Sequence, residues 1–319
     1  MKIVVLDGYT ANPGDLNWNA LTSLGDTTIY DRSSLAQTSA RIADADIVLT
    51  NKALLTKEII DNAPRLKYIG VMATGYNIVD ITAAVKRSIV VTNVPAYSIA
   101  AVAQLVFAYV LQLFTNVSAY AQSVHDGDWV RSKDFSYHLQ RITELKDKTL
   151  GIIGLGQIGK AVARIALAFQ MQVIASHHHP ERDKMEGVRF VSEEMCFAEA
   201  DIVTLHCPLN EQNKYFVNER LLSKMKPSAF LINTSRGGLI NEPDLADALN
   251  NNRIAGAALD VLSTEPPAAD NPLLYARNCL ITPHSGWASY EARSRLMTEV
   301  VKNVVAFLKD HPANVVSSN

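Results

Sequence analysis

Short apolar runs alternate with amphipathic segments along the first hundred residues. Apolar residues spaced near 3.6 positions predict helices over Ala53–Asn62 and Asp80–Arg87, with Thr56 and Asp80 as N-caps. Four runs rich in valine and isoleucine predict strands buried on both faces, namely Lys2–Leu6, Ile47–Thr50, Leu66–Val71 and Ile89–Val94. Strands and helices in alternation predict a parallel sheet covered by helices.

A second alternating series begins at Thr149. The expected strands are Leu150–Ile153, Val173–Ala175, Ile202–His206, Ala229–Asn233, Gly256–Asp260 and Cys279–Thr282. The expected helices are Ile158–Phe169, Glu193–Ala198, Glu219–Met225, Pro243–Asn250 and a final one over about Ala288–Leu308. The fold class is therefore α/β, with two Rossmann-like, doubly wound parallel-sheet domains.

The segment between the two series is apolar and then polar. We expect one long helix from about Ile99 to Ala121, apolar over most of its surface and buried against more than one neighbour. A second subunit is one such neighbour, which favours a dimer. Residues 122–148 are polar and irregular, with Trp129 and Phe135 as expected anchors.

Length, charge and cysteine content narrow the class of protein. The 319 residues suit two domains, and a formal net charge of −2 gives no electrostatic basis for binding nucleic acid. The N-terminal apolar run ends at Asp7, and Gln104 and Gln112 interrupt the longest apolar stretch, so we expect neither a signal peptide nor a membrane span. Three scattered cysteines fit neither a disulfide framework nor a zinc site, and favour a cytoplasmic protein without a metal.

Gly154, Gly156 and Gly159 form a G-x-G-x-x-G motif between an expected strand and an expected helix. This context is typical of dinucleotide binding, because the glycines permit a tight turn and close backbone approach, and the helix N-terminus attracts the pyrophosphate. The motif predicts NAD or NADP as the cofactor. A glycine-rich turn without a ligand is the weaker alternative.

Residues after the next strand bear on the choice between NAD and NADP. An acidic residue is expected about 20 positions after the motif, yet none lies between Gly159 and Glu181, and the strand ends in His177-His178-His179. The missing acid would admit a 2′-phosphate, which Ser176, the histidines and Arg182 could bind. A solvated histidine loop that accepts NAD is an equal alternative, and a metal site is not favoured.

Arg236, Glu265 and His284 follow apolar strands, where open α/β sheets bind ligands. An arginine can hold a carboxylate with two parallel hydrogen bonds, and a histidine can donate the proton that ketone reduction by hydride transfer requires. A neighbouring carboxylate would keep the imidazolium populated. Taken singly, an arginine more often forms a surface salt bridge, and a histidine beside an apolar strand is more often packed than catalytic.

The chain resembles the D-isomer-specific 2-hydroxyacid dehydrogenase family over essentially its full length, through GIIGLGQIG, HCPLN, INTSRGG, ALDVL followed by EPP, and ITPHSGWAS. The resemblance implies that Arg236, Glu265 and His284 are catalytic, with Glu265 as the partner of the proton donor His284. It implies that backbone N–H groups at Ala73, Thr74 and Gly75 help to hold the substrate carboxylate. It also implies cofactor contacts beyond the glycine motif, at Gln157, Ile158, His206, Cys207, Pro208, Thr234, Asp260 and Gly286. We add Ser235, which follows Thr234, and His177, which stands where the family usually has its acidic ribose-binding residue.

The opening MKIVVLDGYTANPGDLNW and the later stretch PHSGWAS are most similar to the glycerate dehydrogenase (hydroxypyruvate reductase) branch of that family. The family architecture implies a discontinuous substrate-binding, flavodoxin-like domain over residues 1–98 and 289–319, an NAD(P)-binding domain over 99–288, and a homodimer. We expect reduction of hydroxypyruvate to D-glycerate, with Trp287 as a wall that limits substrate size. Glyoxylate or D-lactate chemistry and a dinucleotide-sensing, corepressor-like binding protein are the alternatives.

Overall fold

The computed structural model describes residues 1–316 and divides the chain into two compact units. Unit 1 contains Met1–Ser98 and the C-terminal segment that begins at Ala288, and unit 2 contains Ile99–Trp287. The return to unit 1 therefore lies one residue earlier than the sequence suggested. Each unit has its own parallel sheet, so the expected α/β class with two doubly wound sheets is confirmed.

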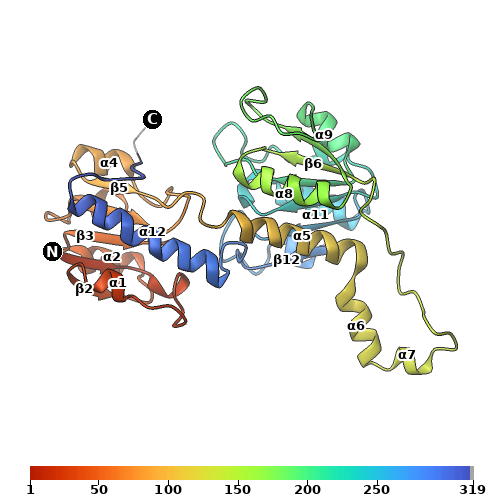
Figure 1. The fold of residues 1–319 in the computed structure, drawn as a ribbon, viewed down its shortest axis with the longest axis horizontal. Coiled ribbons are helices and arrows are strands. Elements are labelled where there is room, and N and C mark those ends of the chain that lie inside the picture. The colour runs from red at the N-terminus through yellow and green to blue at the C-terminus, as the bar shows by residue number, and fades with distance from the viewer. Residues whose placement is uncertain (317–319) are drawn as a thin grey trace. The chain divides into compact units, whose positions relative to one another are not determined.

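The sheet of unit 1 has the strand order β2-β1-β3-β4-β5 and is parallel throughout (Figure 1). This is the flavodoxin-like order. Its strands are β1 (Lys2–Val5), β2 (Asp26–Ile29), β3 (Ile47–Thr50), β4 (Tyr68–Val71) and β5 (Val90–Thr92). The sequence pattern missed β2, an edge strand that is half-exposed and carries little apolar signal.

The described part of unit 1 contains five α-helices, together with a 3₁₀ helix over Gly8–Thr10. They are α1 (Asn19–Thr22), α2 (Leu35–Ile42), α3 (Lys57–Asp61), α4 (Ile81–Lys86) and α12 (Tyr290–Leu308). Thr56 and Asp80 cap α3 and α4 as expected, whereas α3 is shorter than its apolar pattern suggested. The missed helix α2 starts at a capping box formed by Ser34 and Gln37.

Helix α12 completes unit 1 although it lies almost two hundred residues from Ser98 in sequence. The rings of Tyr68 on β4 and Phe307 on α12 lie 4.7 Å apart, and Asn303 donates from Nδ2 to the carbonyl oxygen of Asn93. Arg293 donates two hydrogen bonds of 2.7 and 2.6 Å to the carboxylate of Asp15. The returning helix is thus tied both to the sheet and to the loop before α1.

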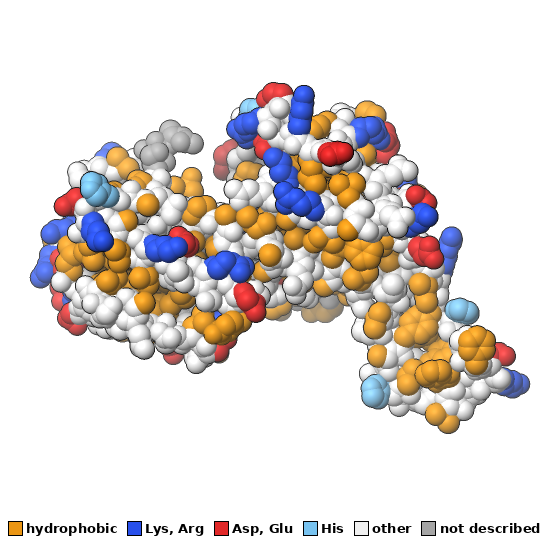
Figure 2. Space-filling model, in the orientation of Figure 1, with side chains coloured by type: hydrophobic (Ala, Val, Ile, Leu, Met, Phe, Trp, Pro, Cys, Tyr) orange, Lys and Arg blue, Asp and Glu red, His pale blue; other side chains and the backbone are white. Residues whose placement is uncertain are grey.

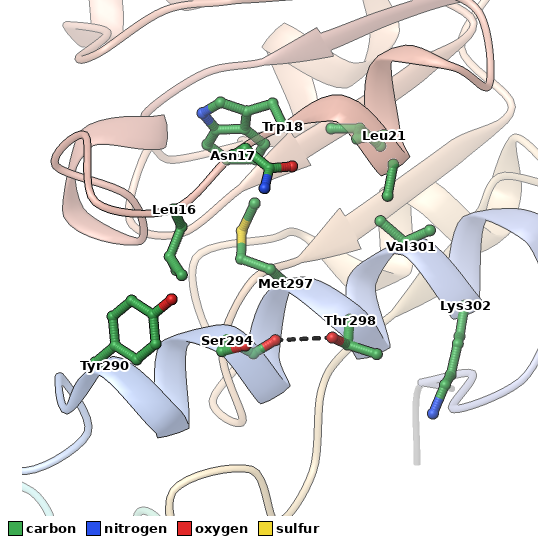
Figure 3. A pocket seen from close by; sticks show the side chains of 11 residues that line it. Leu16, Asn17, Trp18, Leu21, Tyr290, Ser294, Met297, Thr298, Val301 and Lys302 are labelled. Atoms are coloured by element: carbon green, nitrogen blue, oxygen red, sulfur yellow. Dashed lines mark hydrogen bonds between the residues drawn. The ribbon is translucent and has the colours of Figure 1, made fainter.

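A cavity of about 340 Å³ lies between α12 and the segment 16–21. Figure 3 shows Met297 of α12 pointing toward Asn17 and Trp18, with Leu21 and Val301 beside it. None of the residues proposed for catalysis or cofactor binding lines this cavity. The cavity is a feature of unit 1 alone.

The sheet of unit 2 has the order β12-β11-β10-β9-β6-β7-β8 and is also parallel. Its strands are β6 (Thr149–Ile153), β7 (Gln172–Ser176), β8 (Val188–Phe190), β9 (Ile202–Leu205), β10 (Phe230–Asn233), β11 (Gly256–Leu259) and β12 (Cys279–Ile281). Successive strand residues face opposite layers: Leu231 packs in one buried cluster and Ile232 in the other. The sequence pattern missed β8, a three-residue edge strand.

Helices cover both faces of this sheet (Figure 1). Helices α5 and α8 share one buried cluster with the strands, and α9, α10 and α11 share the other. The α-helices of unit 2 are α5 (Ile99–Thr115), α6 (Val117–His125), α7 (Asp128–Arg131), α8 (Gln157–Ala168), α9 (Glu193–Glu199), α10 (Glu219–Leu222) and α11 (Glu242–Asn250), with 3₁₀ helices over Gly237–Leu239 and Pro272–Tyr275.

The single helix expected from Ile99 to Ala121 is wrong. The chain bends by 57° between α5 and α6, because Asn116 adopts a left-handed conformation with φ of 50°. Asn116 is fixed there by the side chains of Gln112 and Gln140, which lie 2.9 and 3.0 Å away.

No single helix within residues 1–316 is long and apolar enough to cross a membrane. Among these residues only the bent α5–α6 pair has the length and composition, and much of α5 is buried.

Residues 116–142, which we call the arm, extend from the body of unit 2 (Figure 1). Within the arm, Trp129 donates from its indole nitrogen to the carbonyl oxygen of Phe135. Yet Trp129 is 54% exposed and Phe135 is 91% exposed, so neither is the buried anchor that we expected. Figure 2 shows apolar side chains gathered on the surface of α6 and α7.

Candidate active site

The residues singled out from the sequence follow the carboxyl ends of parallel strands, as ligand sites do in open α/β sheets. In unit 2 they follow six strands: Gly154–Gly159 after β6, His177 after β7, His206–Pro208 after β9, Thr234–Arg236 after β10, Asp260 after β11 and His284–Trp287 after β12. Ala73, Thr74 and Gly75 follow β4 in unit 1. Glu265 lies in the loop after Asp260.

The loop after β6 has the geometry of a phosphate cradle. Gly154 has a φ of +97°, and a Cβ atom there would lie 2.7 Å from the backbone nitrogen of Cys207. No side chain caps the N-terminus of α8 at Gly156, and a Cβ on Gly156 would face open space. The first N–H groups of a helix have no intrahelical partner, so those of Gln157, Ile158 and Gly159 can bind an anion.

The loops after β9 and β10 are joined to each other. Ser235 donates from Oγ to the carbonyl oxygen of Cys207 across 2.6 Å. The hydroxyl oxygen of Thr234 is buried and has no hydrogen-bond partner among residues 1–316. A buried hydroxyl without a partner is costly, and a polar group of a bound dinucleotide would satisfy it. These loops therefore fit the expected cofactor.

His206 and the cysteines have pKa values unsuited to proton transfer at neutral pH. Burial lowers the pKa of His206 to about 3, and its Nε2 lies 3.0 Å from the hydroxyl of Thr204. His206 is therefore neutral and is not a proton donor at neutral pH. Burial raises the pKa of Cys207 to about 11 and those of Cys196 and Cys279 to about 12, so all three are thiols rather than nucleophilic thiolates.

Within residues 1–316, the guanidinium cation of Arg236 has no protein counter-ion. Its guanidinium donates to the carbonyl oxygen of Ser235 across 2.7 Å, and no carboxylate lies within ion-pair distance among the described residues. The turn that follows is packed closely, since a Cβ on Gly237 would lie 1.9 Å from the backbone carbon of Leu262. Gly237 thus brings the Arg236 turn against the loop that leads to Glu265. A half-buried guanidinium in this state can bind a ligand carboxylate.

His284 and Glu265 form a close pair. Nδ1 of His284 lies 2.6 Å from Oε2 of Glu265, and the other oxygen of Glu265 accepts from the backbone N–H of Leu262. Nδ1 thus carries the proton that bonds the carboxylate, whereas Nε2 of His284 has no hydrogen bond within residues 1–316. The arrangement leaves Nε2 able to give a proton to a bound substrate.

Asp260 holds the loop that carries His284. Its carboxylate is 2% exposed and accepts hydrogen bonds from the backbone N–H groups of Ser285 and Gly286, each 2.8 Å long, and from the hydroxyl of Thr282 at 2.5 Å. Thr282 is bonded in turn to the hydroxyl of Tyr109 on α5. His284 itself has a φ of 52°, a conformation that is uncommon outside glycine. The sequence did not reveal this network, which fixes His284 in a strained backbone.

His177 is engaged on both ring nitrogens. Its Nδ1 accepts from the backbone N–H of Leu155 at 3.2 Å, and its Nε2 lies 3.0 Å from Oδ2 of Asp183. The single proton of this neutral ring is therefore on Nε2 and is directed at Asp183. Our expectation that His177 could bond a 2′-phosphate is wrong in this arrangement, because no N–H of the ring is left. Sequence reasoning also missed Asp183, which the following loop brings back to the strand end.

In unit 1, residues 73–75 form a loop fixed from the segment after β5. Val94 donates from its backbone N–H to the carbonyl of Ala73, and Asn93 donates to the carbonyl of Thr74 across 2.7 Å. The hydroxyl of Thr74 donates to the carbonyl of Val94. The backbone N–H groups of Thr74 and Gly75 have no hydrogen bond within residues 1–316. They can therefore bind an anion.

Comparison with known proteins identifies the family of this chain. The family model of the D-isomer-specific 2-hydroxyacid dehydrogenase NAD-binding domain matches residues 107–286. This chain belongs to that family. Its members are oxidoreductases that act on CH–OH groups, and NAD-type cofactor binding to unit 2 follows from the matched domain.

Relatives and solved structures extend the match over the whole chain. A hydroxypyruvate reductase from Blautia hydrogenotrophica is 45% identical over 99% of this chain and 100% of its own. An acyclic imino acid reductase in complex with NADPH and D-Arg has a TM-score of 0.87, 36% identity and coverage of 99% and 100%. A D-lactate dehydrogenase from Aquifex aeolicus, complexed with NAD and lactic acid, has a TM-score of 0.86 and 28% identity over the full length of both chains.

Proposed function

We propose that this enzyme reduces hydroxypyruvate to D-glycerate with a reduced nicotinamide dinucleotide. The observation that carries the reaction type is the 2.6 Å contact between His284 and Glu265, which lies in the same unit as the dinucleotide cradle and a guanidinium without a counter-ion. The similarity to a hydroxypyruvate reductase over the full chain supports the choice of substrate.

Arg236 binds the substrate in this proposal. Its planar guanidinium donates to the carboxylate and to the keto oxygen, and thereby orients the carbonyl carbon. In unit 1, the backbone N–H groups of Thr74 and Gly75, which have no hydrogen bond within residues 1–316, are donors that can bind an anion. As the carbonyl oxygen gains negative charge during reduction, the cation of Arg236 stabilises it.

His284 completes the reaction. When bound, the reduced nicotinamide supplies the hydride that reaches the carbonyl carbon. His284 gives the proton on Nε2 to the carbonyl oxygen, so that an alcohol forms and the imidazole is left neutral. Glu265 holds Nδ1, which fixes the orientation of the ring and leaves Nε2 for the substrate. The histidine then regains a proton from solvent.

Trp287 is proposed as a wall of the substrate pocket. It lies three residues after His284 and is half-buried. An indole there restricts the side of the substrate beyond C3, which favours a small keto acid. Hydroxypyruvate and glyoxylate meet that restriction.

Steady-state reduction of hydroxypyruvate, glyoxylate and pyruvate, each with NADH and with NADPH, tests the proposal. We expect hydroxypyruvate to have the highest kcat/KM and D-glycerate to be the product on chiral chromatography. A higher kcat/KM for pyruvate or glyoxylate would reassign the substrate. Tight cofactor binding without turnover of any of the three would instead favour a dinucleotide-sensing protein.

We infer that the arm joins two copies of the chain in a cytoplasmic homodimer. Val130 and Phe135 are 89% and 91% exposed, and Val117 is 64% exposed. None of the arm residues belongs to a buried cluster of the described chain. A contiguous apolar surface of this kind marks an interaction site, and closed homodimers are the commonest assemblies. The buried, high-pKa thiols suit a reducing compartment.

A further inference from the structure

The acidic side chain of Asp183 lies beside His177 at the carboxyl end of β7, although the sequence has no acidic residue at that strand end. Asp183 lies six residues after His177, yet its Oδ2 is 3.0 Å from Nε2 of that ring. His177 in turn accepts the backbone N–H of Leu155, inside the glycine motif. Asp183 is therefore linked through one imidazole to the loop that cradles the cofactor phosphates. In dinucleotide folds this strand end faces the adenine ribose.

Two cationic side chains, those of Lys160 and Arg182, donate hydrogen bonds to the carboxylate of Asp183. Lys160, in the first turns of α8, donates from Nζ to Oδ1 of Asp183 across 2.7 Å. Arg182 donates from Nε to Oδ2 at 3.2 Å. The Asp183 side chain is 18% exposed and that of Lys160 is 25% exposed, so this pair is shielded from solvent more than a typical surface ion pair. The hydrogen bond from Lys160, and then that from His177, lowers the pKa of Asp183 well below its usual range.

The charges of this cluster determine whether it favours a ribose 2′-hydroxyl or a 2′-phosphate. With a neutral His177, the cluster of Lys160, Arg182 and Asp183 has a formal charge of +1. If the carboxylate were absent, two cations would face the ribose without a partner, which is the environment that a 2′-phosphate requires. With the carboxylate present, those cations are occupied, and a 2′-phosphate would meet a negative charge. A ribose 2′-hydroxyl, by contrast, can donate to a carboxylate.

We propose that Asp183 is the residue that selects NADH over NADPH in this enzyme. It takes the place of the acid that is missing from the end of β7, and it does so from the following loop. Lys160 and Arg182 hold it against His177 and are thereby withheld from a phosphate. This inference deepens the proposed function, because it assumes that unit 2 binds a nicotinamide dinucleotide.

Asp183→Asn tests the proposal, with Kd for NADH and NADPH measured by fluorescence titration and kcat/KM measured for both. We expect the wild-type enzyme to bind NADH more tightly. In the variant the ratio of NADPH to NADH efficiency should rise at least tenfold, mainly because NADPH binds more tightly. Glu181→Gln removes a neighbouring acid of the same loop, 71% exposed and 3.7 Å from His179, and should leave the ratio unchanged.

A second substitution keeps the test decisive if Asp183→Asn folds poorly. Lys160→Met removes a cation and leaves the carboxylate, so the NADPH-to-NADH ratio should fall below the wild-type value. Equal losses of affinity for both cofactors in both variants would mean that the cluster only holds the loop together, and would overturn the proposal. Cofactor Kd values do not depend on the keto acid, so a wrong substrate would show as absent turnover with the Kd ratio still shifted.

Discussion

The hydroxyl of Thr282 donates to Oδ1 of Asp260 across 2.5 Å, and the same carboxylate receives the N–H groups of the two residues that follow His284. Every partner of Asp260 in this network is a donor. The strained backbone of His284 therefore depends on a carboxylate that is 2% exposed and accepts from all sides. A strained backbone conformation of this kind persists where several surrounding contacts hold it in place.

Asp260→Asn should both destabilise the protein and slow the reaction. The amide would place its NH₂ group against a donor, and a buried donor without an acceptor costs about 1–3 kcal/mol. We expect a lower urea midpoint for unfolding and a reduced kcat, since the loop of His284 loses one of its restraints. Thr282→Ser keeps the hydroxyl and is the matched control. Equal stability of Asp260→Asn and the wild type would contradict the role of this network.

His284→Asn should reduce kcat by about 10²–10⁴, the range typical of losing a general acid. Cofactor affinity should change little, because the substitution removes the proton donor and not the phosphate cradle. Single-turnover measurements with hydroxypyruvate check the chemical step directly. His311→Asn, an exposed histidine in unit 1, is the control. A His284→Asn enzyme that keeps most of its kcat would exclude His284 as the donor.

Arg236→Lys should keep the charge and still impair the enzyme. A lysine cannot form two parallel hydrogen bonds with a carboxylate. Loss of one charge-assisted bond costs about 1.5–3 kcal/mol, which corresponds to roughly a 10- to 100-fold lower kcat/KM. The pH dependence of kcat should be unaffected, since the proton donor is intact. A change confined to kcat at saturating substrate, with an unaltered KM, would argue against carboxylate binding.

The strands were predictable because parallel strands buried on both faces are continuous apolar runs. The missed strands, β2 and β8, are edge strands with partly exposed residues. The break at Asn116 was hidden because apolar residues continue on both sides of it, while its cause is a backbone conformation set by Gln112 and Gln140. The spacing of apolar residues indicates which positions are buried. It does not indicate local hydrogen bonds between side chains, such as those of Asn116.

The site was predictable to the extent that it lies at strand ends. Parallel strands bring their carboxyl ends to one edge, so His284 and Arg236 could be placed in the same unit from their positions alone. The carboxylate of Asp183 beside His177 could not be found in this way. Asp183 reaches His177 through the path of a loop, and neither residue spacing nor composition encodes that path.

Acid should destabilise the fold partly through His206. Its folded pKa of about 3 lies below the ordinary value of 6.5, so the unfolded chain takes up a proton that the folded chain does not. The resulting stability is present above pH 6.5 and is lost progressively as the pH falls from 6.5 toward 3. Urea unfolding of the wild type and His206→Gln at pH 7 and at pH 4.5 checks this. The glutamine variant should lose less stability between the two pH values; an equal loss would show that His206 is not buried as a neutral ring.

The exposed apolar side chains of the arm should be required for assembly. Phe135→Glu combined with Val130→Glu puts two charges into a surface that is otherwise apolar, and burying them unpaired in an interface is costly. We expect the wild type to be a dimer by sedimentation velocity and the double variant to be a monomer with an unaltered circular dichroism spectrum. Tyr275→Glu changes an aromatic residue of unit 2 that is 76% exposed but lies outside the arm, so it should remain dimeric. A double variant that stays dimeric would mean that the subunits meet on another face, and that the arm needs a different explanation for its exposed side chains.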